Sequence, residues 1–339
     1  MLKIAYELPA RVVTNDELAA LYDGWTPEKI LSKTGIASRH VAAADETAGD
    51  LAVRAAEKLF ASGVRRDAVD FILFCSQSPD YKLPSTACLI QDRLHLPKGV
   101  GALDYDLGCS GFVYGLSLAK GLVAGGIAKG VLLLTAETYS KYIHPLDKSV
   151  RTIFGDGAAA TFVDGAAAAS IGAFSFGTDG SGAEKLIVRT GGARAPLVDA
   201  EGRLRSAVPA DAAVADASGN VRGANNIFMA GPDIFNFTLD IVPKTMDDVC
   251  AKNGLTRDDI DLFVFHQANK FMLDTLRKVN GLPRDRFVVD LADVGNTVSS
   301  TIPIALVRAA EKGVLRSGMK TMVMGFGVGL SWGATIVGW

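Results

Sequence analysis

Cysteine and histidine are scarce in this sequence, and neither occurs in a metal-binding pattern. The 339 residues include 4 cysteines, with no CxxC pair, and 4 histidines, with no HxxxH or HxH pair. A zinc ribbon or a thioredoxin-type redox site is therefore not expected. A disulfide scaffold is not expected in a chain of this length either. We predict a protein without a metal site.

An excess of positive charge and long apolar runs are also absent. Lys and Arg number 35 against 37 Asp and Glu, so the net charge is −2 and no basic field for nucleic acid is expected. No run of eighteen apolar residues occurs, which argues against a membrane span. The first residues lack the charged and apolar regions of a secretory signal, so we expect a cytoplasmic protein.

What the chain does contain is an internal duplication. Residues 66–74 (RDAVDFILF) and 257–265 (RDDIDLFVF) share Arg, Asp, Asp and Phe at equal spacing, 191 positions apart. Lys129 and Lys320, each followed by an apolar run, have the same offset. Repeats at one offset indicate two copies of an ancestral unit. We predict two halves, residues 1–168 and 169–339.

Each half has the pattern of an α/β structure, with short apolar strands alternating with helical stretches. The segment 183–224 lacks clear periodicity and is predicted to be an insertion or surface excursion. Helices are predicted over 47–62, 85–95, 110–125, 232–253, 269–280 and 300–316, and strands over 69–75, 130–136, 158–163, 260–265, 320–326 and 333–337.

The helix predicted over 110–125 carries only one charge, Lys120. A helix that is apolar around most of its circumference must be buried on most sides. Two similar halves, each with a sheet, would enclose such helices between them. We therefore predict a duplicated fold of two pseudo-twofold related halves, layered as an α/β/α/β/α sandwich.

Cys109 lies where a glycine-flanked turn (DLGCSG) runs into this buried helix. The positive end of a helix dipole and its free N–H groups favour the thiolate, which is the nucleophilic form of cysteine. Taken alone, Cys109 is either a nucleophile or a buried structural cysteine. The other three cysteines are interpreted as small core residues.

Two further polar residues follow predicted strands or precede predicted helices in the second half. His266 stands at the carboxyl end of strand 260–265, where open α/β sheets place their ligands. Asn296 follows Gly295 and could equally be a turn or cap residue. Cys109 plus 191 is residue 300, the start of the matching helix, so pseudo-twofold symmetry would bring the three residues to one interface. The glycine-rich turn 325–330 (GFGVGL) could direct main-chain N–H groups toward an oxyanion.

Together these motifs resemble the thiolase-fold condensing enzymes, and most closely β-ketoacyl-acyl-carrier-protein synthase III. The matching segments span nearly the whole chain: residues 8–15, 33–36, 84–88, 106–111, 153–158, 266–269, 295–297 and 332–333.

The resemblance implies an acyltransferase that initiates fatty-acid synthesis. Cys109 would take an acyl group from acyl-CoA, with the main-chain N–H groups of Cys109 and Val328 holding the oxyanion. His266 and Asn296 would bind the thioester carbonyl of malonyl-acyl carrier protein during decarboxylative condensation. The resemblance implies no cofactor, with acyl-CoA as a substrate, and a homodimer. It also suggests substrate contacts for a further set of residues: Lys33, Lys148, Arg151, Asn269 and Leu83, with Tyr81 near the last.

The chain departs from the family pattern at the nucleotide end of the site. Lys29 aligns with a position that is usually aromatic, and Trp25 lies nearby but offset. Lys33 and Lys148 replace typical arginines and cannot form the planar guanidinium fork.

Three alternatives remain at the sequence level. One is a specialised family member with a different acyl donor or acceptor, serving secondary-metabolite, polyketide-starter or surface-lipid synthesis. Another is a non-catalytic acyl-binding subunit, which would be expected to lose the nucleophile. The last is a thiolase proper, which would carry a second catalytic cysteine near the C-terminus, whereas the last cysteine here is Cys250.

Overall fold

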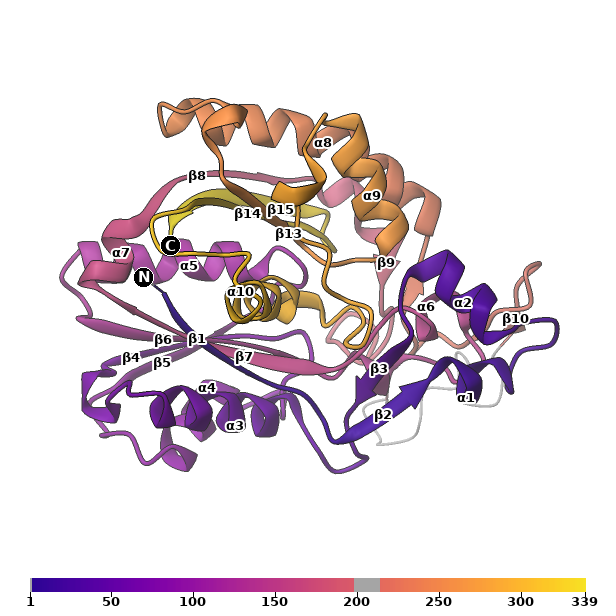
Figure 1. The fold of residues 1–339 in the computed structure, drawn as a ribbon. Coiled ribbons are helices and arrows are strands. Elements are labelled where there is room, and N and C mark those ends of the chain that lie inside the picture. The colour runs from indigo at the N-terminus through magenta and orange to yellow at the C-terminus, as the bar shows by residue number, and fades with distance from the viewer. Residues whose placement is uncertain (1, 198–213) are drawn as a thin grey trace.

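The computed structural model describes residues 2–197 and 214–339, which form two main β-sheets with helices between and outside them (Figure 1). Strands of the first sheet fall between residues 3 and 164, and those of the second between 171 and 338. The division into 1–168 and 169–339 stays a prediction.

The first sheet has five strands in the order β1-β7-β6-β4-β5. β4 runs parallel to both β5 and β6, whereas β7 is antiparallel to β6 and β1. The bounds are β1 Lys3–Glu7, β4 Phe71–Cys75, β5 Gly101–Tyr105, β6 Gly130–Glu137 and β7 Gly157–Asp164.

The second sheet has four strands in the order β8-β15-β14-β13. β13 is parallel to β14, and the two remaining pairs are antiparallel. This is the order and direction of β1-β7-β6-β4. The bounds are β8 Ile171–Thr178, β13 Leu262–Phe265, β14 Lys320–Gly327 and β15 Ser331–Gly338.

The duplication extends to individual hydrogen bonds. The Asp70 carboxylate accepts from the Lys129 N–H at 2.8 Å, at the start of β6. The Asp261 carboxylate accepts from the Lys320 N–H, also at 2.8 Å, at the start of β14. The second pair lies 191 positions after the first. Each half therefore joins its two central parallel strands through an equivalent aspartate hydrogen bond.

Helices form three layers around the two sheets, as Figure 1 shows. α3 and α4 cover the outer face of the first sheet, α5 and α10 lie between the sheets, and α8 and α9 cover the outer face of the second. This arrangement confirms the predicted layered fold. The bounds are α3 Ala48–Ala61, α4 Thr86–Arg93, α5 Gly111–Ala124, α8 Gly231–Lys252, α9 Lys270–Val279 and α10 Thr301–Glu311.

Small residues allow α5 to pack tightly between the sheets. A Cβ atom on Gly111 would collide with the Cys75 sulfur, and one on Gly115 would collide with the Tyr105 hydroxyl. These glycines let the helix backbone approach strands β4 and β5 closely. α5 therefore begins directly after Cys109 at a fixed place between the two halves.

The smaller elements surround one end of the sandwich, except α7 (Gly165–Ser170), which lies at the opposite end (Figure 1). The helix α2 begins at Pro27, is capped by the Thr26 hydroxyl and ends at Gly35, which has φ +73°. Further bounds are β2 Arg11–Thr14, α1 Asn15–Ala19, α2 Pro27–Thr34, β3 Ser38–Val41, α6 Lys148–Arg151, α7 Gly165–Ser170, β9 Leu186–Ile187, β10 Val214–Ala215, β11 Val221–Arg222 and β12 Phe228–Met229.

The predicted helices and strands all occur, with ends that differ by at most five residues. Three strands of the two main sheets were not predicted: β1, β5 and β8. β5 contains Asp104, whose carboxylate accepts the main-chain N–H groups of Thr86 and Ala87 and thereby caps α4. A carboxylate used in this way interrupts the apolar pattern by which a buried strand is recognised.

The segment 183–224 is more ordered than predicted where it is described. It contributes β9 and the β10–β11 pair, while residues 198–213 of that prediction lie outside the described residues. None of the helices in the described ranges is long and apolar enough to cross a membrane.

Candidate active site

A cavity of about 780 Å³ opens between the two halves at the end where the smaller elements gather. Cys109, His266 and Asn296 all line it, so the structure brings the three predicted residues to one space. They come from the turn before α5, the end of β13 and the loop before α10.

Glycines of β14 make room for Cys109. A Cβ atom on Gly327 would lie 2.7 Å from the Cys109 sulfur, and one on Gly325 would lie 2.5 Å from the Cys109 carbonyl oxygen. A Cβ atom on Gly108 would reach to 2.5 Å from Val328 Cγ1. Any side chain at these positions would displace the thiol or the neighbouring backbone.

Cys109 is only 6% exposed, so its thiol is almost completely removed from water. Burial, with a smaller contribution from the charge of Glu137, raises the pKa of Cys109 to about 12. Hydrogen bonds from the main-chain N–H groups of Val328 and Cys109 oppose the rise. The main-chain N–H groups thus favour the thiolate as expected, but desolvation outweighs them. The same two N–H groups are those predicted to form the oxyanion hole.

Hydrogen bonds hold both the backbone and the ring of His266. Its backbone N–H donates to the Met324 carbonyl at 2.8 Å, and its Nδ1 lies 2.7 Å from the Thr301 hydroxyl oxygen. Burial lowers the pKa of His266 to about 3, with a hydrogen bond to the Val298 backbone opposing the shift. The imidazole is therefore neutral, and its Nε2 is the nitrogen left for the cavity.

Asn296 is held by a short parallel bridge with Phe154. Its N–H donates to the Ile153 carbonyl and its own carbonyl accepts from Gly155, both at 3.0 Å. Its side-chain Oδ1 accepts from the Val298 N–H at 2.9 Å. The amide is thereby oriented with its Nδ2 free to donate.

A buried carboxyl, Glu137, lies at the end of β6 near these groups. It accepts from the Gln77 N–H at 3.1 Å and from the hydroxyls of Ser78 and Ser299 at 3.0 and 3.2 Å. Burial raises the pKa of Glu137 to about 8. The sequence analysis did not identify this residue, which follows an ordinary apolar strand.

Predicted substrate-binding lysines occur at the cavity mouth. Lys33 and Lys148 line the cavity together with Trp25, and the Lys33 ammonium is 5.9 Å from the Trp25 ring centre. Lys29, which aligns with the usual aromatic position, does not line the cavity; the Trp25 ring does. Lysine attracts phosphate as a point charge.

A hairpin formed by β10 and β11 completes the mouth, and the sequence analysis missed it. The Lys148 ammonium donates to the Ser218 carbonyl at 2.6 Å, and Arg222 pairs with the buried Asp147 at 2.9 Å. The hairpin residues that line the cavity are Asp216, Asn220 and Arg222. The Ser218-Gly219-Asn220 turn was the available signal for a hairpin.

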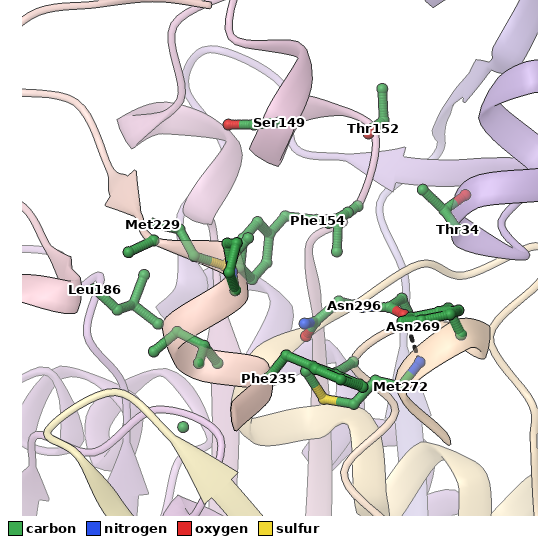
Figure 2. A pocket seen from close by; sticks show the side chains of 18 of the residues that line it. Thr34, Ser149, Thr152, Phe154, Leu186, Met229, Phe235, Asn269, Met272 and Asn296 are labelled. Carbon is green, nitrogen blue, oxygen red and sulfur yellow. Dashed lines mark hydrogen bonds between the residues drawn. The ribbon is translucent and has the colours of Figure 1, made fainter. Parts of the chain in front are cut away.

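The inner wall is apolar, as Figure 2 shows around Phe154, Leu186 and Met229. These side chains belong to the loop before β7, to β9 and to β12. Phe235 and Met272 line the same cavity. An apolar wall around a few polar groups is the usual composition of a small-molecule site.

The remaining predicted contacts divide into two groups. Asn269 lines the cavity, and its Oδ1 caps α9 by accepting from the Met272 N–H at 2.9 Å (Figure 2). Arg151 is not among the residues that line the cavity, and its substrate contact stays a prediction. Leu83 is 82% exposed and is also not among the lining residues, so its substrate contact stays a prediction.

Two duplicated halves that enclose a thiol, an imidazole and an amide define the class of thiolase-fold condensing enzymes. Comparisons with known proteins specify the family. The family model described as "3-Oxoacyl-[acyl-carrier-protein (ACP)] synthase III" matches residues 103–180, and its C-terminal counterpart matches residues 250–339.

Full-length relatives have the same description. A curated β-ketoacyl-[acyl-carrier-protein] synthase III of Streptococcus pyogenes is 34% identical over 99% of this chain and 97% of its own. A crystal structure of a 3-oxoacyl-(acyl-carrier-protein) synthase III is 52% identical, covers 99% of this chain and 98% of that chain, and has a TM-score of 0.92. The structure of 3-oxoacyl-(acyl-carrier protein) synthase from Burkholderia xenovorans is 35% identical, with a TM-score of 0.86 over 99% of this chain and 93% of that one.

The chain belongs to the β-ketoacyl-[acyl-carrier-protein] synthase III family. It is a condensing acyltransferase of the type that initiates fatty-acid synthesis, and a specialised pathway is not favoured.

Proposed function

We propose that Cys109, His266 and Asn296 catalyse the condensation of an acyl-CoA with malonyl-acyl carrier protein. The observation that carries this proposal is the position of the Cys109 sulfur, which accepts main-chain N–H groups in a cavity that His266 and Asn296 also line.

In the first step, the Cys109 sulfur attacks the thioester carbonyl of acyl-CoA. The carbonyl oxygen becomes an oxyanion, which the N–H groups of Cys109 and Val328 stabilise. The bond to the CoA sulfur breaks, and the thiol proton passes to the departing CoA thiolate. The acyl chain lies against the apolar wall of Phe154, Leu186 and Met229.

In the second step, malonyl-acyl carrier protein loses carbon dioxide, and the electron pair forms an enolate. His266 Nε2–H and Asn296 Nδ2–H donate to the enolate oxygen. The enolate carbon attacks the acyl carbonyl, the bond to the Cys109 sulfur breaks, and the sulfur takes up a proton. The high pKa of Cys109 favours this return to the thiol. The reaction as proposed draws on no cofactor.

Acyl-CoA is the proposed donor because Lys33, Lys148 and Trp25 stand at the mouth. Two ammonium groups suit the phosphates of a nucleotide, and the indole offers a face for its base. The Asp216 carboxylate at the same mouth limits how many phosphates can approach the hairpin.

A homodimer is proposed from the exposed loop and the edge of the first sheet. Tyr81 and Leu83 are 63% and 82% exposed, and Leu103 on the edge strand β5 is 38% exposed. A second copy would cover these apolar side chains and satisfy the free edge of β5. Leu83 could then reach a cavity as the family resemblance implies.

The test is intact-protein mass spectrometry after incubation with acyl-CoAs from acetyl to long chain. We expect a gain of one acyl group in the wild type and in Cys88→Ala, which removes an exposed cysteine, but none in Cys109→Ala. The preferred chain identifies the donor. If neither acyl-CoA nor acyl-carrier-protein donors modify Cys109, the proposal is wrong.

A further inference from the structure

A buried arginine, Arg39 of β3, stands out among the groups that the proposed reaction does not use. Arg39 is 1% exposed, and its partners in the described part of the chain are three oxygen atoms, none of which belongs to a carboxylate. Burial and the nearby charge of Arg151 lower the pKa of Arg39 to about 10, so the guanidinium is still charged at pH 7. A buried cation without an opposite charge is costly, which directs attention to the hydrogen bonds that it makes.

The Arg39 guanidinium donates in two directions. Nη1 donates to Asn15 Oδ1 at 2.9 Å and to the Val13 carbonyl at 3.2 Å. Nη2 donates to the Thr152 carbonyl at 2.9 Å, which lies 113 positions away in the sequence. Arg39 therefore joins the segment of β2 and α1 to the end of α6.

Asn15 continues these hydrogen bonds to α2. It is 5% exposed, and its Nδ2 donates to the Ile36 carbonyl at 2.8 Å, just after α2 ends. At the other end, Thr152 follows α6, and its hydroxyl donates to the Lys148 carbonyl at 2.8 Å. One continuous set of hydrogen bonds thus runs from the C-terminal end of α2, through Asn15 and Arg39, to the C-terminal end of α6.

The two helices that are joined in this way carry the two lysines of the cavity mouth. Lys33 belongs to α2 and Lys148 to α6, and both line the cavity. Each ammonium is a point charge on a flexible stem, so their helices must set the spacing at which both reach the phosphates of one nucleotide. A planar guanidinium suits the task of holding these helices, because its fork fixes the direction of each bond, which a lysine does not.

We propose that Arg39 is a positioning residue that fixes the spacing of Lys33 and Lys148 for the phosphates of the acyl donor. This role rests on the proposed function, in which acyl-CoA is the donor. A separate hydrogen bond, from the Tyr22 hydroxyl to the Pro145 carbonyl at 2.9 Å, also joins the segments that lead into α2 and α6. A variant of Arg39 should therefore keep these segments together and lose their fixed spacing.

The test compares two acyl donors that differ only in the nucleotide: an acyl-CoA and the acyl-pantetheine with the same acyl chain. At limiting acyl-CoA, Arg39→Met should acylate Cys109 about tenfold more slowly than the wild type, the scale of one weakened hydrogen bond to a charged phosphate. With acyl-pantetheine, it should stay within about threefold of the wild type, because that donor has no nucleotide. Equal losses with both donors, or no loss with acyl-CoA, would overturn the proposal.

Further variants separate geometry from charge. Arg39→Lys keeps the positive charge but not the fork, so it should behave like Arg39→Met; full restoration by lysine would show that charge alone acts and would overturn the positioning role. Arg65→Met removes a guanidinium whose side chain is 78% exposed, and it should match the wild type. Should Arg39→Met fail to fold, Asn15→Ala interrupts the same hydrogen bonds, and the same outcomes apply.

Calorimetric titration with CoA gives a readout that needs no reaction. We expect the dissociation constant for CoA to rise about tenfold in Arg39→Met. If the wild type binds CoA but forms no acyl adduct, the proposed function fails, while this titration still decides the role of Arg39. An unchanged dissociation constant in Arg39→Met, or a wild type that binds no CoA, would overturn the inference.

Discussion

Burial keeps the titratable side chains of the site neutral. It raises the pKa of Cys109 and Glu137 and lowers that of His266. Each shift favours the uncharged form, as expected where water is excluded and no opposite charge is close. The enzyme therefore rests with a thiol and a neutral imidazole, and negative charge arises only on reaction, where main-chain N–H groups receive it.

Removing the Glu137 charge should make Cys109 easier to ionise, but only at high pH. Because the pKa of Glu137 is about 8, its carboxyl is mostly protonated at pH 7 and charged above pH 9. In Glu137→Gln we expect iodoacetamide to alkylate Cys109 at the wild-type rate at pH 7 and about tenfold faster at pH 10, a change of roughly one pK unit.

Other titratable groups interact with the charge of Glu137 and must be considered in this experiment. Asp106 raises its pKa, and Cys109, Tyr139 and Tyr142 feel its charge. Burial raises the pKa of both tyrosines, which opposes their ionisation. Glu311→Gln removes the same charge from an exposed position and should leave both alkylation rates unchanged. An equal acceleration of Glu137→Gln at pH 7 and pH 10 would contradict the electrostatic explanation.

At the scale of the element, α5 carries glycines with opposite roles. A Cβ on Gly115 would strike Tyr105 and Leu133, whereas a Cβ on Gly121 would have no atom within 4 Å. Gly121→Ala should therefore raise the free energy of unfolding by about 0.5–1 kcal/mol, the helix-propensity difference, and Gly115→Ala should lower it by about 1–3 kcal/mol through overpacking. Urea denaturation measures both, and stabilisation of Gly115→Ala would show that α5 is packed less tightly.

The elements also show what the sequence could predict. Cys109 and His266 were found because each adjoins a strongly apolar segment, and the 191-residue offset placed the loop of Asn296 at the same interface. The family resemblance then suggested their roles. The hairpin at the mouth was not found, because Lys148 and Ser218, 70 positions apart, meet only in the folded chain. The main-chain N–H groups at Cys109 could be anticipated because a helix start is visible in the sequence, whereas the burial that outweighs them depends on the whole fold.

For the whole molecule, duplication explains why the cavity forms between the halves. Asp70 and Asp261 start equivalent parallel strands, and the equivalent helices α5 and α10 lie together in the central layer (Figure 1). The thiol precedes α5, and the amide and Thr301 stand at the start of α10. Since equivalent turns face one another across the pseudo-twofold axis, one half can supply the nucleophile and the other the groups that polarise a carbonyl.

The two sheets differ at one edge, and this difference leads to the last prediction. The first sheet has the additional strand β5, which pairs on one side only, with β4. In the second sheet, the corresponding position holds a single parallel bridge between Phe263 and Phe287. An uncovered edge strand with an exposed Leu103 is a template for pairing with another chain.

We therefore expect light scattering to give twice the chain mass of 35.6 kDa for the wild type. Leu103→Lys should shift this toward the monomer, because a lysine on an edge strand opposes pairing. Leu118→Lys, at a 43% exposed position on α5, is the matched control and should keep the wild-type mass. A wild type that runs at 35.6 kDa would exclude the dimer. A dimer unaffected by Leu103→Lys would place the interface away from β5. The β5 edge would then not bring Leu83 to the cavity of the other copy.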